Sequence, residues 1–377
     1  MILLALSVAS LAAWLYLACF HGWFWLTGPV LEPPSAPLRA RRVAVVIPAR
    51  DEAESIERCL QSLLAQELDA ELAILLVDDN STDGTGSLAC AVASASRSQH
   101  RLIVLDGQPL PAGWSGKLWA VHQGLSHPAA RAAEYVLLTD ADIEHAPDHL
   151  ARLLSKAEQD NRQMVSEMVR LHCKTFAERA LIPAFIFFFQ MLYPFRRTAA
   201  PASHVAGAAG GTMLVARHAL DHIGGVEAIR GNLIDDCALA AAIKQSGGRI
   251  WLGHAPDTHS LRVYRGPDEI WNMVARTAYV QLRHSPLVLA DCLLGMTLLY
   301  VAPVALAFAG PSRMAALAAW VLMSVLFVPT LRAYRVSRLW SIALPAIAMF
   351  YMAATLASAI RHHKGRGGGW KTRTYSH

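Results

Sequence analysis

Residues 72–85 read LAILLVDDNSTDGT, an apolar run that ends in an acidic, polar turn. Runs of the same apolar character occupy residues 43–47, 102–105 and 135–139. Between the run at 43–47 and the run that begins at residue 72, apolar residues recur with helical spacing over residues 56–64. Continuous apolar strands that alternate with helices are typical of a parallel sheet covered on both faces. We therefore expect an α/β domain built on a mostly parallel sheet.

Acidic residues follow three of these strands at the point where each strand ends. They are Asp51 and Glu52, Asp78 and Asp79, and Asp140 and Asp142. Helix capping accounts for single acidic residues, and we expect Asp83 to be one. Three clusters at one edge of a sheet repel each other unless a cation is present, and this edge is where such sheets bind ligands. Asp140 and Asp142 offer hard oxygen ligands that suit Mg²⁺ or Mn²⁺ bridging to a diphosphate.

The 377-residue chain is unusually apolar, with 54% hydrophobic and 17% charged residues, against roughly 25% charged in an average soluble domain. Residues 1–31 contain no Asp, Glu, Lys or Arg, and residues 2–26 are long enough to cross a bilayer, which takes ~20 apolar residues. Three more apolar runs occupy residues 287–310, 314–330 and 339–360, with Pro345 interrupting the last. Buried helices of a large soluble core are the alternative interpretation, but such helices alternate polar and apolar faces.

These runs predict five segments: an N-terminal transmembrane anchor (1–28), a basic Pro-rich linker (29–42), an α/β domain (43–285), two to three C-terminal transmembrane helices (286–361) and a basic tail (362–377). Basic residues beside a membrane segment favour the cytoplasmic side. Arg39, Arg41 and Arg42 in the linker therefore predict that the α/β domain faces the cytosol, in a multi-pass protein of a bacterial-type inner membrane. The tail is also basic, yet three C-terminal crossings would place it outside, so we expect one of the three runs to be interfacial or re-entrant.

Charge and cysteine content exclude several other classes. The formal net charge of +5 is spread along the chain, so we expect no nucleic-acid partner. The six cysteines lie far apart with no CxxC pair, so neither a zinc site nor a disulfide framework is indicated.

Several motifs resemble those of family 2 glycosyltransferases, which have the GT-A fold with a Rossmann-like, mostly parallel sheet. In chain order they are VVIPARDE (45–52), DDNSTDGT (78–85), DAD (140–142), GGTMLV (210–215) and NLIDDCAL (232–239). The resemblance covers about residues 43–285. Within the family, GWSGKLWA (113–120), FFFQMLYPF (187–195) and the tail GWK (369–371) are most similar to the hopanoid-biosynthesis-associated membrane glycosyltransferases.

The resemblance implies a role for each matching residue. Asp236 is the expected general base, and Asp235 beside it is expected to raise its proton affinity. Asp140 and Asp142 are the expected metal ligands for Mg²⁺ or Mn²⁺. The residues expected to bind the nucleotide sugar, for which a UDP-sugar is the predicted donor, are Pro48, Arg50, Glu52, Asp78, Asp79, Lys117, Asp140, Asp235 and Arg276. One carboxylate base with no nucleophile fits in-line, inverting transfer.

The sequence departs from the family pattern at several points. Arg50 and Asp51 stand where Tyr-Asn is more common, and Asp235 stands where Glu is more common. The Gln-x-x-Arg-Trp motif of processive polymer synthases is absent, so we expect a single sugar to be transferred. Arg276 and Arg283 are the arginines nearest to that motif, and either is a candidate to hold the diphosphate.

A run of aromatic residues within 174–197, bracketed by basic residues, is the candidate acceptor side. A buried core helix is one interpretation of this run. We favour an interfacial helix with its aromatic residues at the lipid boundary, and residues 268–283 as a second one. Both would hold the active site at the membrane, which predicts a lipid acceptor of isoprenoid or hopanoid type.

Two other functions remain open from the sequence. A nucleotidyltransferase shares the α/β sheet and the metal carboxylates, but it needs a glycine-rich phosphate loop after the first strand, and residues 48–52 contain no glycine. A catalytically silent membrane scaffold that binds a nucleotide sugar is the third candidate, against which the three acidic sites argue.

Overall fold

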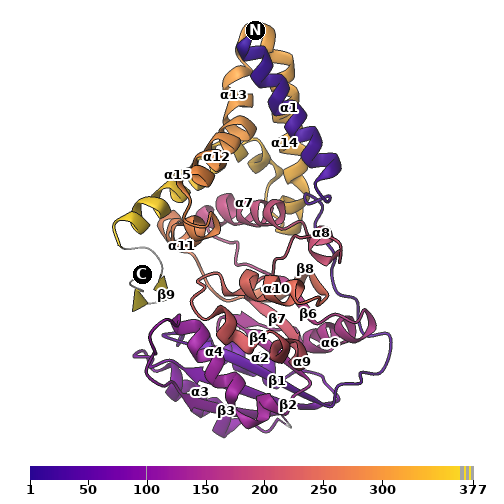
Figure 1. The fold of residues 1–377 in the computed structure, drawn as a ribbon, viewed down its shortest axis with the longest axis vertical. Helices are drawn as coiled ribbons and strands as arrows, with labels where there is room; N and C mark the ends of the chain where they lie inside the picture. The colour runs from indigo at the N-terminus through magenta and orange to yellow at the C-terminus, as the bar shows by residue number, and fades with distance from the viewer. Residues whose placement is uncertain (99, 366–368, 371–372, 375–377) are drawn as a thin grey trace.

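The computed structural model describes residues 1–98, 100–365, 369–370 and 373–374 (Figure 1). One eight-stranded sheet has the order β3-β2-β1-β4-β7-β6-β8-β5. Its strands are β1 (Arg42–Ala49), β2 (Glu71–Asp78), β3 (Arg101–Asp106), β4 (Tyr135–Thr139), β5 (Ile143–Glu144), β6 (Met164–Arg170), β7 (Thr212–Ala216) and β8 (Ile250–Ser260). The four strands expected from the sequence are parallel neighbours, whereas β7 and β5 run antiparallel to theirs.

Alternate residues of β1 feed two separate cores, which explains its unbroken apolar sequence. Val45 and Ile47 join a cluster under α2 (Ile56–Leu64) and α6 (His149–Gln159). Val46 joins a second cluster under α4 (Gly116–Ser126) and α10 (Asp235–Gln245) on the opposite face. Helix α4 approaches so closely that a Cβ on Gly124 would lie 2.5 Å from Val46.

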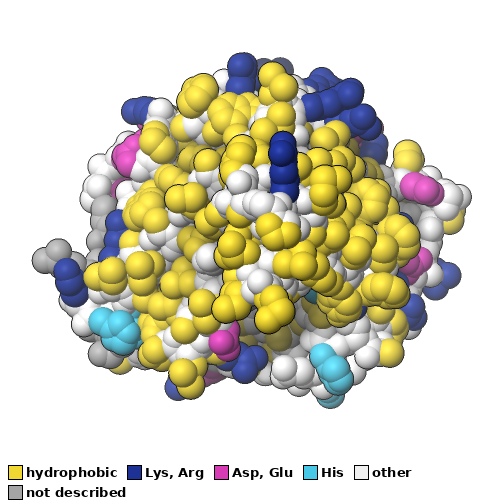
Figure 2. Space-filling model, turned by 90° about the horizontal axis from the view of Figure 1, so that it is seen from above, with side chains coloured by type: hydrophobic (Ala, Val, Ile, Leu, Met, Phe, Trp, Pro, Cys, Tyr) yellow, Lys and Arg dark blue, Asp and Glu magenta, His cyan; other side chains and the backbone are white. Residues whose placement is uncertain are grey.

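Among the described residues, four helices are long and apolar enough to cross a membrane: α1 (Ile2–Phe20), the segment Pro286–Leu306, the segment Gly310–Ala333, and α15 (Leu344–His363). Pro286–Leu306 comprises α12 (Pro286–Met296), η2 (Thr297–Val301) and α13 (Ala302–Leu306). Gly310–Ala333 comprises η3 (Gly310–Ser312) and α14 (Arg313–Ala333). Helix α1 and the segments Pro286–Leu306 and Gly310–Ala333 form the tapered end of the molecule in Figure 1, and α15 lies at its base. Seen from that end, the surface is dominated by hydrophobic side chains, with basic ones mainly around the rim (Figure 2).

The apolar helices are largely exposed, which is unlike the core helices of a soluble protein. In the best window of Pro286–Leu306, 11% of the residues are buried. Two sequence expectations need correction in detail. The first run ends as helix at Phe20 rather than near residue 26. Pro345 does not interrupt the last run, because it lies in the first turn of α15, where proline is tolerated.

Helices α7 (Phe176–Leu192), α8 (Phe195–Ala199) and α11 (Pro267–Gln281) lie between the sheet and the apolar helices (Figure 1). The expectation that their aromatic residues lie at the lipid boundary is wrong for several side chains. Phe187 is buried, with ring centroids 5.2 Å from those of both Phe24 and Phe327. Tyr279 of α11 is buried as well. These helices join the α/β domain to the apolar bundle, so their aromatic residues pack between two parts of the protein.

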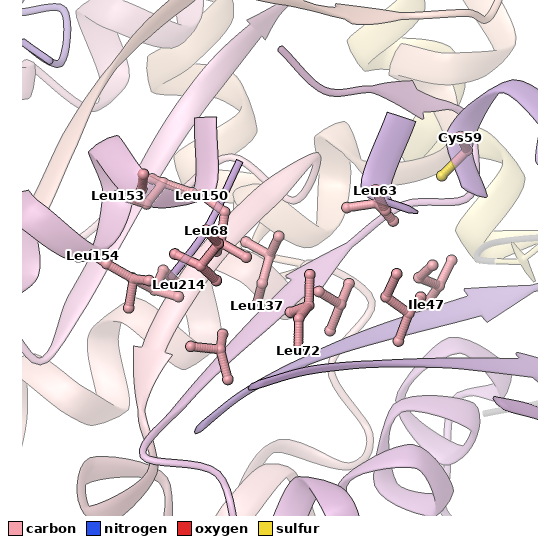
Figure 3. Close-up of a cluster of buried hydrophobic side chains, with 14 of the residues drawn as sticks. Ile47, Cys59, Leu63, Leu68, Leu72, Leu137, Leu150, Leu153, Leu154 and Leu214 are labelled. Carbon is pink, nitrogen blue, oxygen red and sulfur yellow. The ribbon is translucent and has the colours of Figure 1, made fainter. Parts of the chain in front are cut away.

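The remaining elements surround the sheet. They are α3 (Thr85–Ala95), α5 (Pro128–Arg131), α9 (Arg217–His222), η1 (Gly225–Ile229), η4 (Arg338–Ser341) and the short pair β9 (Gly369–Trp370) and β10 (Arg373–Thr374). A leucine-rich cluster packs between the strands β1 and β2 and the helices α2 and α6 (Figure 3). Of the predicted tail motif, Lys371 lies outside the described residues.

Candidate active site

A cleft of about 1230 Å³ lies where the sheet edge meets α7, α11 and the end of α15. Eight of the predicted site residues line it: Pro48, Glu52, Lys117, Asp140, Asp142, Asp235, Asp236 and Arg276. The strand register explains why, since Ala49 is paired with Asp78 and the acidic turns therefore begin at one level of the sheet. Residues more than 200 positions apart in sequence thus meet in one cavity.

Arg50, Asp78 and Asp79 are not among the residues that line this cleft. Asp79 is fully buried, and its carboxylate lies 3.5 Å from the Arg50 guanidinium. The Asp78 carboxylate accepts hydrogen bonds from the backbone and hydroxyl of Ser81, which closes the turn after β2. In this structure the three residues fix the loop beside the cleft, and their contact with a nucleotide stays a prediction.

Asp51 ties the turns after β1 and β2 together. Its φ of 51° lies in the left-handed region, which Asp and Asn tolerate better than other side chains. Its carboxylate accepts a 2.9 Å hydrogen bond from the Thr82 backbone, and its own N–H donates to the Ser81 hydroxyl. Asp51 can therefore adopt the left-handed backbone conformation that Asn, the more common residue at this position, would also adopt.

Lys117 lies at the centre of the acidic groups. Its ammonium is 2.9 Å from Asp140 and 3.2 Å from Asp235. Burial opposes the charged ammonium, but the carboxylates of Asp140 and Asp235 outweigh it and raise the pKa of Lys117. The residue lies in the first turn of α4, which Ser115 caps by accepting from the Leu118 N–H. The helix start therefore aims this cation at the strand ends.

Asp236 occupies the first turn of α10, where a carboxylate is favoured by the helix dipole. Its two oxygens accept hydrogen bonds from the backbone N–H groups of Gly210 (2.9 Å) and Cys237 (2.7 Å). Burial and the adjacent Asp235 charge raise the pKa of Asp236 to about 6, while Lys117 acts in the opposite direction. A Cβ on Gly210 would lie 3.3 Å from the Asp236 carboxylate, so only glycine leaves this approach unobstructed.

Asp142 is paired with a cation that the sequence analysis did not identify. Arg262, just after β8, lies 2.8 Å from Asp142 and 3.2 Å from Glu52. These carboxylates raise the pKa of Arg262 against the effect of burial. Arg262 follows a strand at the same sheet edge as the acidic turns, and a predicted strand over residues 250–260 would have pointed to it. That strand is not predicted from the sequence.

The carboxylates fit a divalent cation that shares its ligands with a diphosphate. Within the described part of the chain, no three His, Cys, Asp or Glu side chains gather into a complete metal cage. Mg²⁺ is commonly held by one or two carboxylates together with substrate phosphates rather than by such a cage. Asp140 and Asp142 both face the cleft, which satisfies that requirement.

A buried hydrogen-bonded chain supports the strand end that carries Asp140. Glu167 lies 2.9 Å from His149, whose other ring nitrogen lies 2.9 Å from His145. His145 in turn lies 3.1 Å from the Thr139 hydroxyl, which donates to the Gly211 carbonyl. Burial and the neighbouring His149 lower the pKa of His145 well below its ordinary value. The sequence offered no signal for this chain, because its members come from separate elements.

Glu178 fixes the start of α7 against the cleft. Its fully buried carboxylate accepts from the backbone N–H groups of Lys174, Thr175 and Tyr264, and contacts the His172 ring at 2.8 Å. Burial alone would raise the pKa of Glu178, but these hydrogen bonds lower it. Thr175 and Glu178 form a capping box, a pattern that is readable from the sequence.

The wall opposite the sheet combines apolar and basic side chains. Phe185 and Phe189 of α7 and Met273 of α11 line the cleft there. Arg276 and Arg361 line the same side, and the Arg361 guanidinium donates to the Asn272 side chain over 2.9 Å. One cavity therefore has an acidic half at the strand ends and an apolar, basic half toward the helical bundle.

Comparison with known proteins agrees with this architecture. The sequence model of glycosyl transferase family 2 matches residues 44–224. The undecaprenyl-phosphate 4-deoxy-4-formamido-L-arabinose transferase of Sodalis glossinidius (strain morsitans) is 31% identical over 128 residues, which cover 33% of this chain and 36% of that protein. The chain thus matches about a third of that relative's length.

Solved structures align with this chain at lower sequence identity. The mannosyltransferase PcManGT of Pyrobaculum calidifontis, solved with GDP-Man and Mn²⁺, aligns with a TM-score of 0.59 at 21% identity, over 98% of this chain and 100% of that chain. The glucosyl-3-phosphoglycerate synthase of Mycobacterium tuberculosis, solved with Mg²⁺ and uridine diphosphate, aligns with a TM-score of 0.42 at 18% identity, over 64% of this chain and 79% of that chain. The predicted family is confirmed for residues 44–224, which carry a family 2 glycosyltransferase domain, and the predicted GT-A fold is confirmed as well.

Proposed function

We propose that this protein is a membrane-bound, inverting glycosyltransferase that moves one sugar from a nucleotide-diphosphate sugar to an isoprenoid- or hopanoid-type lipid. One observation carries the proposal. Asp236, with its raised pKa, lines the same cleft as the acidic strand ends and the apolar side chains of Phe185, Phe189 and Met273. Donor and lipid acceptor can therefore meet at a single carboxylate.

The donor lies over the strand ends in this proposal. Pro48 and Glu52 bound the nucleotide, and Lys117 meets the negative charge of the diphosphate. Asp140 and Asp142 hold a Mg²⁺ or Mn²⁺ ion, which supplies Lewis-acid stabilisation of the departing diphosphate. The ion pairs of Lys117 with Asp140 and of Arg262 with Asp142 support this assignment, because they mark both carboxylates as cation sites.

Asp236 acts as general base. The acceptor oxygen attacks the anomeric carbon, a hydroxyl acceptor passes its proton to the Asp236 carboxylate, and the bond from the anomeric carbon to the diphosphate oxygen breaks. A single in-line displacement inverts the anomeric centre. A positioned base of this kind contributes ~10²–10⁴-fold to the rate. A pKa of about 6 leaves the carboxylate ionised at neutral pH and more basic than an ordinary aspartate.

The acceptor occupies the apolar half of the cleft. Phe185, Phe189 and Met273 suit the hydrocarbon next to the reacting group, and Arg276 and Arg361 suit an anionic head group. The Sodalis relative is named for an undecaprenyl-phosphate substrate, which supports a lipid phosphate as one form of the acceptor. A polyprenyl phosphate and a hopanoid alcohol are distinguished by the acceptor experiment below.

The proposed location is a bacterial-type inner membrane, with the catalytic domain in the cytosol. The apolar helices and the basic residues at their catalytic-domain ends, such as Arg332 and Arg335, support it.

The first test compares the wild type with Asp236→Asn in a detergent-solubilised sample, using a panel of nucleotide sugars with Mg²⁺ or Mn²⁺. We expect release of a nucleoside diphosphate that falls ~10²–10⁴-fold in Asp236→Asn. Asp221→Asn is the matched control, because its side chain is 57% exposed and paired with Arg217 on the far side of the domain. Equal rates for Asp236→Asn and the wild type would favour the nucleotide-sugar-binding scaffold or another base. Release of a sugar 1-phosphate, with the nucleoside monophosphate transferred instead of the sugar, would favour a nucleotidyltransferase.

The second test offers acceptors in mixed micelles: a polyprenyl phosphate, a hopanoid alcohol and a water-soluble sugar alcohol. Transfer to a lipid is expected, and the lipid that accepts the sugar identifies the head group. Transfer to the water-soluble compound alone would refute the lipid acceptor while leaving the donor chemistry intact.

A further inference from the structure

Three of the four apolar segments run from the catalytic domain to the far tip of the molecule. The N-terminus of α1 lies at the tip (Figure 1), where α1 packs against η3, and the backbone of Phe20 at its other end accepts from Arg197 of α8. Pro286–Leu306 leaves α11 and rises to η3, and α14 returns. After α14, the Tyr334 hydroxyl accepts from the backbone of Leu171, just beyond β6. Each of these segments therefore crosses the full height of the bundle.

Helix α15 differs, because both of its ends lie at the catalytic domain. Just before it, the Trp340 ring packs 5.4 Å from Phe176 at the start of α7. At its last turn, Arg361 donates to Asn272 of α11 and lines the catalytic cleft. The next ring, His362, stacks 4.1 Å from His284 at the end of α11. A helix of 20 residues is ~30 Å long, so a crossing helix would carry Arg361 to the opposite side of the membrane.

Contacts along the length of α15 confirm its course. The Tyr351 hydroxyl donates to the backbone of Leu181 in α7 over 2.9 Å. Further on, the Ser358 hydroxyl accepts from the backbone of Tyr279 in α11 over 3.0 Å. The short strand β9 after it lies at the level of the catalytic domain in Figure 1. The helix thus stays beside α7 and α11 from one end to the other.

The outer face of α15 is apolar and its flanks are basic. Met349, Leu356 and Ile360 are 55%, 44% and 47% exposed. Exposed Arg338 precedes the helix and exposed Lys364 follows it. An apolar face with basic flanks fits the boundary between lipid head groups and acyl chains, where long cationic side chains reach the head groups.

We propose that α15 lies flat in the lipid interface on the catalytic side, and that the chain crosses the bilayer three times. The partner of its exposed face is the head-group and acyl boundary of the cytosolic leaflet. The N-terminus then lies on the opposite side from the catalytic domain, and the basic tail lies on the same side as that domain. This arrangement resolves the conflict between the basic tail and a fourth crossing.

The first experiment distinguishes three crossings of the membrane from four. The full chain carries one epitope at each end, and protease is added to spheroplasts and to inverted vesicles from a bacterial host. We expect the N-terminal epitope to be digested in spheroplasts and the C-terminal epitope in inverted vesicles. Four crossings would put both epitopes on one side and would overturn the proposal.

A pair of arginine substitutions tests the position of α15 separately. Leu356 lies in the interface in our proposal, whereas Val321, which is 61% exposed, lies midway along the crossing helix α14. We expect Leu356→Arg to reach the membrane at the wild-type amount and with the wild-type epitope pattern, because arginine can extend to the head groups. We expect Val321→Arg to be recovered several-fold less. Equal loss of both variants would overturn the proposal.

Discussion

Replacing Lys117 with Met tests the electrostatics of the cleft. The substitution keeps most of the side-chain volume and removes the ammonium that lies 2.9 Å from Asp140 and 3.2 Å from Asp235. Three carboxylates, those of Asp140, Asp235 and Asp236, then face each other without this cation. We expect the variant to be less stable than the wild type and to respond more strongly to a divalent cation.

The expected loss of stability in Lys117→Met follows from the distances between the charges and from the exposure of their side chains. At an effective dielectric constant of ~20, two unit charges 3 Å apart attract by ~5 kcal/mol before desolvation. Breaking a buried pair costs ~3–5 kcal/mol and breaking a surface pair ~0–1 kcal/mol. The side chains of Lys117, Asp140 and Asp235 are 20%, 36% and 14% exposed, so an intermediate loss applies. We expect ~2 kcal/mol, which corresponds to ~4–8 °C in Tm for a domain of this size.

The assay is thermal unfolding in detergent with and without Mn²⁺. In the wild type, Mn²⁺ competes with Lys117 for the Asp140 carboxylate, whereas Lys117→Met leaves that carboxylate available. The Mn²⁺-induced rise in Tm should therefore be larger in the variant. Lys244→Met is the control, because Lys244 donates to the carbonyls of Thr198 and Val205 away from the cleft. It should lower Tm without changing the Mn²⁺ response. An unchanged Tm together with an unchanged Mn²⁺ response in Lys117→Met would refute the reasoning.

Three further outcomes are expected. Transfer should fall about tenfold per pH unit below about pH 6, since Asp236, whose pKa is raised to about 6, must be ionised to accept a proton; a rate that stays level down to pH 5 would exclude it as the base. Gly210→Ala should lower kcat roughly tenfold with little change in Tm, because the new Cβ lies 3.3 Å from the Asp236 carboxylate; an unchanged kcat would contradict this. Glu178→Gln should lower the free energy of unfolding by about 3 kcal/mol, because an amide group cannot accept all of the hydrogen bonds that the buried carboxylate accepts. The measurement is a denaturant titration with Glu227→Gln, at an exposed position, as the control. Equal midpoints for the two variants would argue against the role of Glu178.

Local pattern was sufficient for the half of the sheet that runs from the edge strand β3 through β2 and β1 to β4. The run expected at 135–139 is β4, and the helix expected at 56–64 is α2. Both succeed because a doubly buried strand and a one-sided helix leave different periodicities in the sequence. The acidic turns were found for the same reason, since each follows a run that is unmistakably buried.

Pairing between distant residues could not be predicted. Nothing in the sequence connects Arg262 with Asp142, or Glu167 with His149, because these pairs form when β8 and β6 take their places in the sheet. The aromatic residues of α7 were misplaced for a related reason. An apolar helix that packs against a bundle and one that faces lipid have the same composition, and Phe187 takes the first of these environments.

The orientation of α15 was also out of reach, because hydropathy measures the length of a run and not its direction. In the structure, the neighbours of α15 determine its course, and they place Arg361 in the cleft. The same contacts join the apolar, basic half of the cleft to the apolar helices. If α15 crossed the membrane instead, Arg361 would no longer line the cleft, and the wall that Arg361 completes would be open.

The ion pairs of the cleft also bear on how a donor binds. Lys117 is paired with both Asp140 and Asp235, and Arg262 is paired with both Asp142 and Glu52, so two cations serve four carboxylates. A diphosphate that entered alone would add negative charge to carboxylates that already hold these two cations, and a divalent cation that entered alone would have to displace them. When both enter together, Lys117 and Arg262 can turn to phosphate oxygens while the carboxylates keep a positive partner. The charge of the cleft therefore favours joint binding of donor and metal over binding of either one, and this follows from the same side chains that hold the ligand-free site together.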